Sequence, residues 1–273
     1  MQNFKATPDE LVASFWRNRH LLSALARRDV VGRYRGSIFG ILWSFVNPLM
    51  MLAVYTFAFG IVFGARWTPG SESKMEFAII LFAGMLVFHL FSECINRAPT
   101  LVLSNPSYVK RVVFPLEILP FVALGSGLFH MAVSFSVWLI FYLVGFGLPP
   151  LTIVLLPFVM MPLVMFIMGL SWFLSSLGVY LRDVSHLITS LVLMLLFVSA
   201  VFYPIEKLPE QVRTPLMIAN PMVYHVDTCR KVMIWGQLPS WHSWMIYFVF
   251  GLFVACLGFA WFQKSRKGFA DVI

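Results

Sequence analysis

The feature that most limits the fold of this chain is an abrupt change of character near its N-terminus. Four arginines, Arg27, Arg28, Arg33 and Arg35, are followed by a run without Asp, Glu, Lys or Arg that lasts until Arg66. A helix needs about 20 largely apolar residues to cross a bilayer, and this run is longer. We therefore expect the chain to enter a membrane directly after the arginines.

The composition of the whole chain supports the same interpretation. Of 273 residues, 60% are hydrophobic and 12% are charged, and the mean hydropathy is +0.84. A soluble domain carries about 25% charged residues, so this chain cannot hide its apolar surface in one water-exposed core. We predict a single all-α integral membrane domain. It would comprise a cytoplasmic amphipathic interface helix over residues 1–37, a six-helix bundle over 38–262 and a cytoplasmic tail over 263–273.

Six apolar segments are predicted to be transmembrane helices. They lie at residues 38–65, 77–94, 118–145, 151–180, 184–203 and 244–262. With the N-terminus inside, fourteen of the 20 lysines and arginines fall on the cytoplasmic side, as the positive-inside rule requires. Both termini are therefore predicted to be cytoplasmic, and Arg182 and Asp183 to lie in a tight turn between the fourth and fifth spans.

Two segments outside the spans are predicted to be helical on the cytoplasmic side. The first begins at Thr7, where Glu10 can complete a capping box, and its apolar residues recur at helical spacing. It is either a membrane-surface anchor or an elbow that also contacts a cytoplasmic partner. The second begins at Asn105 and would end at Pro115. Because it exposes both apolar and basic groups, it is either a docking surface or an ordinary connector.

The segment between the fifth and sixth spans is apolar yet repeatedly interrupted by proline. The prolines are Pro204, Pro209, Pro215, Pro221 and Pro239. Apolar pieces too short to cross a bilayer and bounded by prolines fit short re-entrant helices that cap a bundle. A plain extracellular loop is the alternative, although such a loop should be less apolar.

Residues for catalysis, metal binding or nucleotide binding are not evident in the sequence. No Gly-Lys-Ser or Gly-Lys-Thr occurs at the spacing of a phosphate-binding loop, and the histidines lack metal-ligand spacing. We therefore expect no cofactor, with ATP bound by a separate subunit. Glu93 is the one carboxylate within a predicted span, and pairing with Arg97 or with an arginine of the opening segment is expected. Two other classes of membrane protein are not favoured. A secondary transporter would need paired intramembrane charges, and an intramembrane transferase would need an acid–base cluster, and neither pattern is evident in the sequence.

Aromatic residues, at 16% of the chain, are the side chains that the spans supply in abundance. Those of the first and fifth spans are candidates for the lining of a path, because ring faces contact sugars weakly and repeatedly. The alternative is lipid-facing packing and interfacial belts. The candidate lining residues are Phe39, Trp43, Tyr55, Phe59, Phe63, Phe197, Phe202 and Tyr203.

Four stretches of this chain resemble a known family, the membrane subunits of ATP-binding-cassette polysaccharide exporters of the O-antigen and teichoic acid type. The stretches are "RDVVGRYRGSIFGILWSFVNPLMML", "NPSYVKRVVFPLEILP", "YLRDVSHL" and "LPEQVRTPLMIANPMVYHVDTCRKVMIWGQLP". The resemblance implies a homodimer in the bacterial inner membrane, joined to two cytoplasmic ATPase subunits. Its cargo would be a lipid-linked, O-antigen-like glycan. The protein would also contact membrane lipids, and no nucleic acid partner is expected. Capsule or teichoic acid cargo, or a small lipid or drug, are the alternatives.

The resemblance also implies roles for particular residues. Arg27, Arg28, Arg33 and Arg35 would receive the anionic lipid head group at the mouth of the first span. ATPase coupling would involve Asn105, Tyr108, Lys110, Arg111, Arg182 and Asp183. An outer gate would include Pro204, Leu216, Asn220, Pro221 and Arg230.

Overall fold

The structure is a computed structural model that describes residues 7–62, 67, 74–109 and 114–273. Within these ranges the chain is helical with short connections and contains no strand, which confirms the predicted all-α class. The longer helices are α1 (Pro8–Arg17), α2 (Arg19–Tyr34), α3 (Trp43–Tyr55), α4 (Lys74–Arg97), α6 (Leu119–Phe146), α7 (Leu156–Tyr180), α8 (Val184–Val198), α9 (Glu210–Ala219), α10 (Pro221–Met233) and α11 (Trp241–Ser265). The short ones are η1 (Gly40–Leu42), η2 (Thr56–Val62), η3 (Ala98–Thr100), α5 (Pro106–Val109), η4 (Leu116–Ile118), η5 (Leu151–Leu155), η6 (Ile205–Lys207), η7 (Arg266–Gly268) and α12 (Phe269–Val272).

Five helical segments of the described chain are long and apolar enough to cross a membrane, judged by length and composition. They are Gly40–Phe59, Met75–Thr100, Leu116–Phe146, Leu151–Tyr180 and Trp241–Val272. These segments correspond to five of the six predicted spans. The remaining predicted span, the fifth along the chain, corresponds to α8. This helix is apolar but has only 15 residues.

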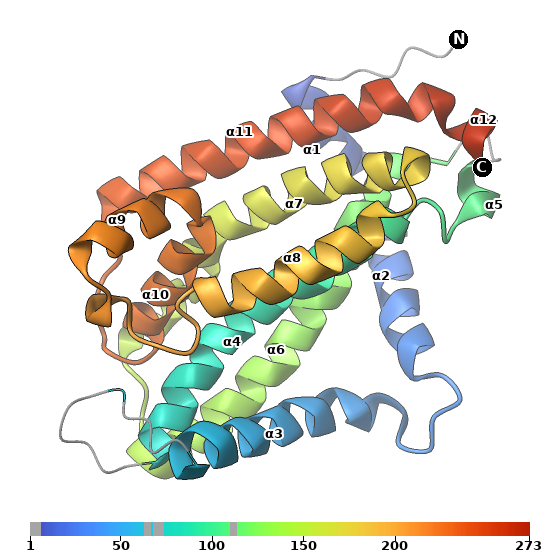
Figure 1. The fold of residues 1–273 in the computed structure, drawn as a ribbon. Helices are drawn as coiled ribbons and strands as arrows, with labels where there is room; N and C mark the ends of the chain where they lie inside the picture. Colours follow the sequence, from blue (N-terminus) through green and yellow to red (C-terminus); the bar gives the residue numbers. More distant parts are fainter. Residues whose placement is uncertain (1–6, 63–66, 68–73, 110–113) are drawn as a thin grey trace.

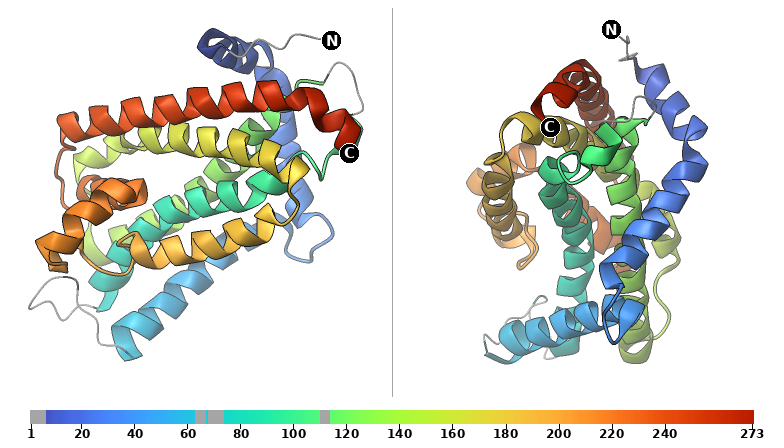
Figure 2. Two further views of the ribbon diagram at one scale, coloured as in Figure 1. Left: turned by 45° about the horizontal axis from the view of Figure 1, so that its top comes forward. Right: turned by 90° about the vertical axis from the view of Figure 1, so that its right-hand side faces the viewer.

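The bundle has two distinct ends and one helix that stands apart. The end that carries α1, α5 and α12 is called here the basic end, and the opposite end, with α9 and α10, the far end (Figures 1 and 2). The central helix is α4, which contacts α6, α7, α8 and α10. In its most apolar stretch of 18 residues, 83% of the residues are buried. In contrast, α3 crosses the side of the bundle and is 11% buried.

The closest helix pair in the bundle is α7 with α11. A Cβ on Gly258 would lie 2.0 Å from the carbonyl oxygen of Gly169, and a Cβ on Gly251 would lie 2.5 Å from that of Pro162. Small residues at such positions let two helices approach backbone to backbone. The glycines therefore determine how α7 and α11 pack.

The N-terminal segment forms two helices in place of the single surface helix expected. They meet at Asn18, whose side-chain amide donates to the carbonyl of Ser14 at 2.9 Å. The predicted capping box at Thr7 is wrong, because Thr7 makes no side-chain cap and Glu10 instead pairs with Arg17 at 2.7 Å. Only α1 lies across the basic end. The second helix, α2, packs along α6 and buries Leu22 (Figure 1).

Two predicted boundaries also need correction. The fifth span was expected to reach residue 203, but α8 ends at Val198, and Ala200 follows with φ of +53°. At the other end, residues 263–273 do not form a simple tail. There α11 continues to Ser265, and Phe269 turns back into the core, 5.5 Å from the ring of Phe262. In both places local contacts outweigh the apolar pattern.

The proline-rich segment forms η6, α9 and α10, and the two longer helices differ in burial. No residue of α9 is buried, whereas α10 buries ten of its 13 residues. Asn220 joins them: its side-chain oxygen accepts from the backbone N–H of Met222 at 3.1 Å and caps α10. The segment therefore supplies one helix to the core and leaves the other on the surface.

Candidate functional site

Five charged or titratable side chains from α2, α4 and α6 form one cluster near the basic end. They are Asp29, Arg33, Glu93, Arg97 and His130, called here the ionic cluster. Arg33 pairs with Glu93 at 2.7 Å, and Arg97 pairs with Asp29 at 2.8 Å. His130 Nδ1 lies 2.9 Å from Glu93. The expected pairing of Glu93 is confirmed for Arg33, and Arg97 lies farther from it, at 4.0 Å.

Asp29 is one of the two carboxylates of the cluster, and it joins α2 to both α4 and α6. It accepts from Arg97 of α4 and, at 2.5 Å, from the hydroxyl of Ser126 in α6. Burial alone would raise its pKa, but the hydrogen bonds from Arg97 and Ser126 and the positive charge of Arg97 outweigh burial. The pKa of Asp29 is therefore lower than its ordinary value of 3.8. The carboxylate is ionised at neutral pH and joins three helices.

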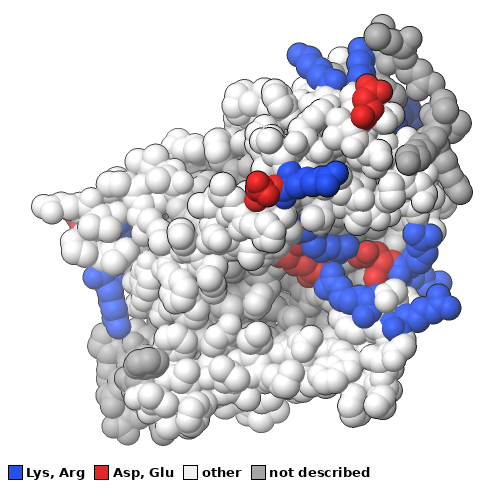
Figure 3. Space-filling model, turned by 45° about the vertical axis from the view of Figure 1, so that its right-hand side comes forward, with Lys and Arg blue, Asp and Glu red and all other residues white. Residues whose placement is uncertain are grey.

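The four arginines of the opening segment are all exposed, but they differ in their contacts. Arg33 belongs to the ionic cluster, and Arg28 donates to the hydroxyl of Tyr108 at 2.7 Å. In Figure 3 the basic side chains gather toward the basic end, and several charged groups lie in a hollow beneath it. Arg27 and Arg35 are thus the two arginines of the set without a side-chain partner among the described residues.

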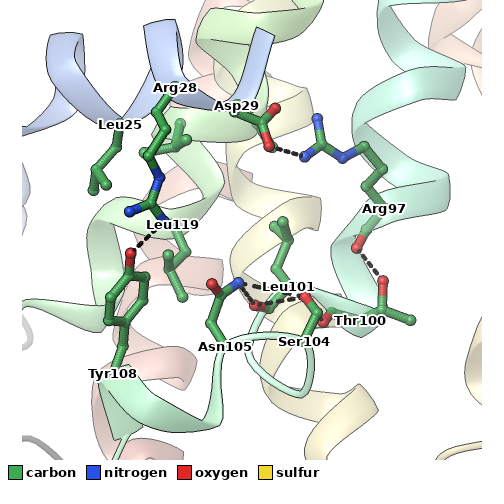
Figure 4. Close-up of a pocket in the computed structure, with 12 residues that line it drawn as sticks. Leu25, Arg28, Asp29, Arg97, Thr100, Leu101, Ser104, Asn105, Tyr108 and Leu119 are labelled. Carbon is green, nitrogen blue, oxygen red and sulfur yellow. Dashed lines mark hydrogen bonds and ion pairs between the residues drawn. The ribbon is translucent and has the colours of Figure 1, made fainter. Parts of the chain in front are cut away.

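Arg28 and Tyr108 lie at a cavity of about 270 Å³ between α2, the end of α4 and α5 (Figure 4). Its lining combines charged and polar groups with a few leucines and small apolar residues. They are Leu25, Arg28, Asp29, Arg97, Thr100, Leu101, Ser104, Asn105, Tyr108, Leu119, Val122 and Ala123. We call it the α2–α5 cavity. It connects a predicted lipid-binding arginine with a predicted coupling tyrosine, two groups that sequence analysis kept separate.

Other predicted coupling residues lie at the same end. Asn105 donates to the carbonyl of Leu101 at 2.9 Å, and its own carbonyl accepts the backbone N–H of Tyr108, which starts α5. Arg182 and Asp183 form the expected exposed turn between α7 and α8. Lys110 and Arg111 lie outside the described residues.

A buried ion pair at the basic end was not expected from the sequence. Glu117 is 4% exposed, and its carboxylate accepts from Arg266 at 2.6 Å and from Ser14 at 3.0 Å. Arg266 also donates to the carbonyl of Phe114 at 2.7 Å. The pair therefore joins α1, the segment before α6 and the C-terminal residues. The sequence feature that could have indicated this pair is Glu117 itself, a single carboxylate directly before the apolar segment 118–145.

Half of the predicted lining residues form one aromatic cluster where η2 meets the end of α8. Phe59 stacks on Phe202 at 5.2 Å, Tyr55 contacts Phe202 at 6.3 Å, and Phe197 contacts it at 5.5 Å. The stretch η2 is π-helical, a geometry that is frequent at functional sites. Segments about 140 residues apart in sequence thus bring four predicted rings together.

The remaining predicted lining residues lie elsewhere. Phe39 and Trp43 contact each other at 5.6 Å before and at the start of α3, at the other end of that helix from Tyr55. Tyr203 packs instead beside Ala200. Phe63 lies outside the described residues. The aromatic cluster is therefore confined to one end of α3.

Arg230, one of the predicted gate residues, is a buried hydrogen-bonding centre. It is 2% exposed and donates to the carbonyls of Ile80 (3.0 Å), Ala200 (2.7 Å) and Val201. The ring of Trp67 covers its guanidinium at 4.3 Å. Because α8 ends at Val198, the carbonyls of Ala200 and Val201 lie outside the helix, and Arg230 donates to both.

Other predicted gate residues surround this centre. The side-chain amide of Asn220 donates to the hydroxyl of Ser199 at 3.0 Å, and Pro221 starts α10. Leu216 packs with Val223 beside Ala200, and Pro204 precedes η6. The predicted gate residues are thus brought together at the far end.

These observations describe a multi-pass helical membrane protein, with its charges concentrated at one end and an aromatic cluster between two of its helices. The family model described as ABC-2 type transporter matches residues 20–234. The chain belongs to this family and is therefore a membrane subunit of a transporter.

Named relatives match nearly the whole chain. It is 26% identical over 264 residues to the O-antigen export system permease protein RfbA of Myxococcus xanthus, covering 96% of this chain and 99% of the relative. It is 24% identical to an RfbA of Klebsiella pneumoniae over 93% of this chain and 95% of the relative. The capsule polysaccharide export inner-membrane protein CtrC of Neisseria meningitidis is 19% identical over 92% of both chains.

Proposed function

We propose that this chain is the permease subunit of an ABC exporter that moves a lipid-linked, O-antigen-like polysaccharide across the bacterial inner membrane. Two copies would surround one path, and two separate ATPase subunits would drive it. Relatives named as O-antigen export permeases match almost end to end, at 96% and 99% coverage for the Myxococcus xanthus protein. This full-length match is the observation that carries the proposal.

The aromatic cluster supports a path between α3 and the end of α8. A long glycan must slide, so tight hydrogen-bonding sites along its route would trap it. Stacked rings such as Phe59 and Phe202, at 5.2 Å, offer a surface that contacts sugar faces without holding individual hydroxyls. The exposed outer side of α3 leaves room for a second copy to complete the wall.

The same proposal fixes the orientation. The basic end would face the cytoplasm with both termini, and α8 would be the fifth of six spans. Arg27 and Arg35, which have no side-chain partner among the described residues, would meet an anionic head group at the inner surface. At the far end, α9 and α10 would be the re-entrant helices of the outer gate.

Capsular polysaccharide is a second candidate cargo, supported by the match to the Neisseria meningitidis capsule export protein. Its lower identity, 19% against 26%, favours the O-antigen type. Export assays in strains that make one polymer or the other would separate the two. Restoration of surface capsule, without restoration of O-antigen, would replace the first proposal with the second.

Purification with and without the ATPase subunit tests the division of labour. The chain alone should hydrolyse no ATP, and the assembled complex should hydrolyse ATP and export polymer into inverted vesicles. An ATPase variant without its catalytic glutamate is the control for contaminating hydrolysis. Robust hydrolysis by the isolated chain would contradict the proposal.

Docking at the basic end gives a further test. The double variant Lys110→Glu, Arg111→Glu should retain insertion and thermal stability but copurify with less ATPase subunit and export less polymer. The matched control is Lys207→Glu with Arg213→Glu at the far end, which should leave copurification unchanged. Normal export by the first variant would exclude these two residues from docking.

A further inference from the structure

We infer that the hydrogen bond between Arg28 and Tyr108 transmits movement of α5 to α2. Arg28 would then be a positioning residue for export and not a ligand of the lipid head group. The inference rests on the proposed function, because it takes α5 to be the element that meets the ATPase subunit.

The contact joins two segments 80 residues apart in the sequence. Arg28 extends from α2 along one wall of the α2–α5 cavity, and its Nη2 reaches the hydroxyl of Tyr108 at 2.7 Å (Figure 4). The ring of Tyr108 stacks on Phe114 at 4.1 Å, with the planes 10° apart. The stack places the ring against the segment before η4, where Phe114 packs beside the cluster that includes Leu22 of α2, while the hydroxyl reaches Arg28 directly.

The surroundings of α5 explain why one hydrogen bond can matter. The helix has four residues, and none is buried. Its Tyr108 and Val109 are partly buried against the core, and the α2–α5 cavity of about 270 Å³ lies between the helix and α2. Among the described residues, Arg28 is the hydrogen-bond partner of α5 from another segment. Movement of α5 can therefore reach α2 directly through this pair, beside an indirect apolar route through Phe114 that Tyr108→Phe would leave in place.

The other side of the link is well connected. Asp29, the next residue after Arg28, is bonded to Arg97 of α4 and to Ser126 of α6. Arg33, about one turn farther along α2, pairs with Glu93 of α4. After Tyr34 the chain leads through η1 into α3, which carries Tyr55 of the aromatic cluster. A displacement of Arg28 would therefore move α2, and with it the ionic cluster and α3, the helix that is proposed to line the path.

The link can be removed without removing the rings. Tyr108→Phe deletes the hydroxyl and keeps the stack on Phe114, and Arg28→Gln deletes the guanidinium. In the assembled complex we expect either variant to copurify with the ATPase and hydrolyse ATP at the normal rate, while polymer exported per ATP falls about tenfold. The double variant should lose no more than either single variant, because both remove the same contact. Arg28→Lys, which keeps a donor, should recover part of the loss.

An exposed arginine in the first turn of α2 provides the matched control: Arg19 lies over the ring of Trp16, and Arg19→Gln should leave export per ATP unchanged. Normal export per ATP in Tyr108→Phe, or additive losses in the double variant, would overturn the inference. Loss of copurification in Tyr108→Phe would also overturn it, because the hydroxyl would then act in docking.

Hydrogen exchange of the α2 amides gives a readout that does not need transport. Binding of the ATPase subunit should change their exchange in the unaltered complex and not in Tyr108→Phe. Failure of the unaltered complex to hydrolyse ATP or export polymer would count against the proposed function. An equal change of exchange in both proteins would count against the link.

Discussion

At the scale of single residues, the molecule depends on a few buried polar side chains that serve backbone rather than substrate. Arg230 is the clearest case, since its guanidinium donates to three carbonyls from two segments and is covered by Trp67. Gly84 makes the room, because a Cβ there would lie 2.2 Å from Arg230 Nη2. Removing the guanidinium leaves buried carbonyls without donors.

We predict that Arg230→Met lowers the free energy of unfolding by about 3 kcal/mol or more, the usual cost of breaking a buried charged hydrogen-bond set. The adjacent Lys231→Met is the control: its pair with Asp227 at 2.7 Å is partly exposed, at 37% for the lysine side chain, and such pairs contribute about 0–1 kcal/mol. Thermal unfolding in detergent measures both. Equal effects of the two substitutions would contradict the assigned role.

The residue scale also shows where sequence reasoning succeeds and where it stops. A carboxylate within an apolar span needs a partner, so the pairing of Glu93 could be predicted, and it is found with Arg33 at 2.7 Å. The contact of Arg28 with Tyr108 could not be predicted, because it depends on how α2 lies along α6. Both arginines look alike in the sequence, and tertiary packing gives them different partners.

At the scale of helices, glycines decide the tightest packing in the bundle. Gly258 and Gly169 bring α11 and α7 into backbone contact, and Gly178 does the same for α7 and η3, where a Cβ would lie 2.0 Å from the carbonyl oxygen of Pro99. In lipid, close packing of this kind replaces the hydrophobic effect as the force between helices. A single methyl group therefore has a large effect at these sites.

Gly258→Ala should lower the midpoint of thermal unfolding markedly, because the new Cβ meets backbone that cannot rotate away; overpacking of this kind costs about 1–3 kcal/mol or more. The matched control is Gly32→Ala in α2, where nothing lies within 4 Å of the added Cβ. There alanine should be neutral or stabilise the helix by about 0.5–1 kcal/mol. The idea fails if Gly258→Ala unfolds at the same temperature as the unaltered protein.

The length of the apolar segments was enough to predict which of them form helices of membrane length, but not where each helix ends. Five of the six predicted spans have counterparts of membrane length. The predicted end of the fifth at residue 203 failed because Arg230 and Asn220, which bond to Ala200 and Ser199, favour a turn there. Likewise, the charges of residues 264–267 suggested a tail, but Phe269 is fully buried.

At the scale of the whole molecule, the position of α3 is the feature with the most direct functional consequence. It crosses the side of the bundle (Figure 1), and its last residue, Tyr55, contacts Phe202 in the turn after α8. We predict that Tyr55→Ala with Phe59→Ala reduces surface polysaccharide severalfold at unchanged membrane abundance, because the proposed path loses its rings. Phe253→Ala on the exposed side of α11 is the control and should export normally.

Cysteine accessibility checks the same positions independently. Cysteines at 55 and 59 should react with a water-soluble thiol reagent in the assembled exporter, and a cysteine at 253 should not, because lipid would cover it. If both path positions resist the reagent in resting and ATP-driven protein, and export is unaffected, the rings face something other than the path.

The short length of α8 has a consequence for the bilayer itself. Its 15 residues give about 22 Å at 1.5 Å per residue, whereas the hydrocarbon layer is about 30 Å thick. In the proposed six-span arrangement the lipids beside α8 must compress to match it. The membrane would then be thinnest next to the helix end that carries Phe197 and the turn to Phe202. A polar chain leaving the protein there would meet the least hydrocarbon.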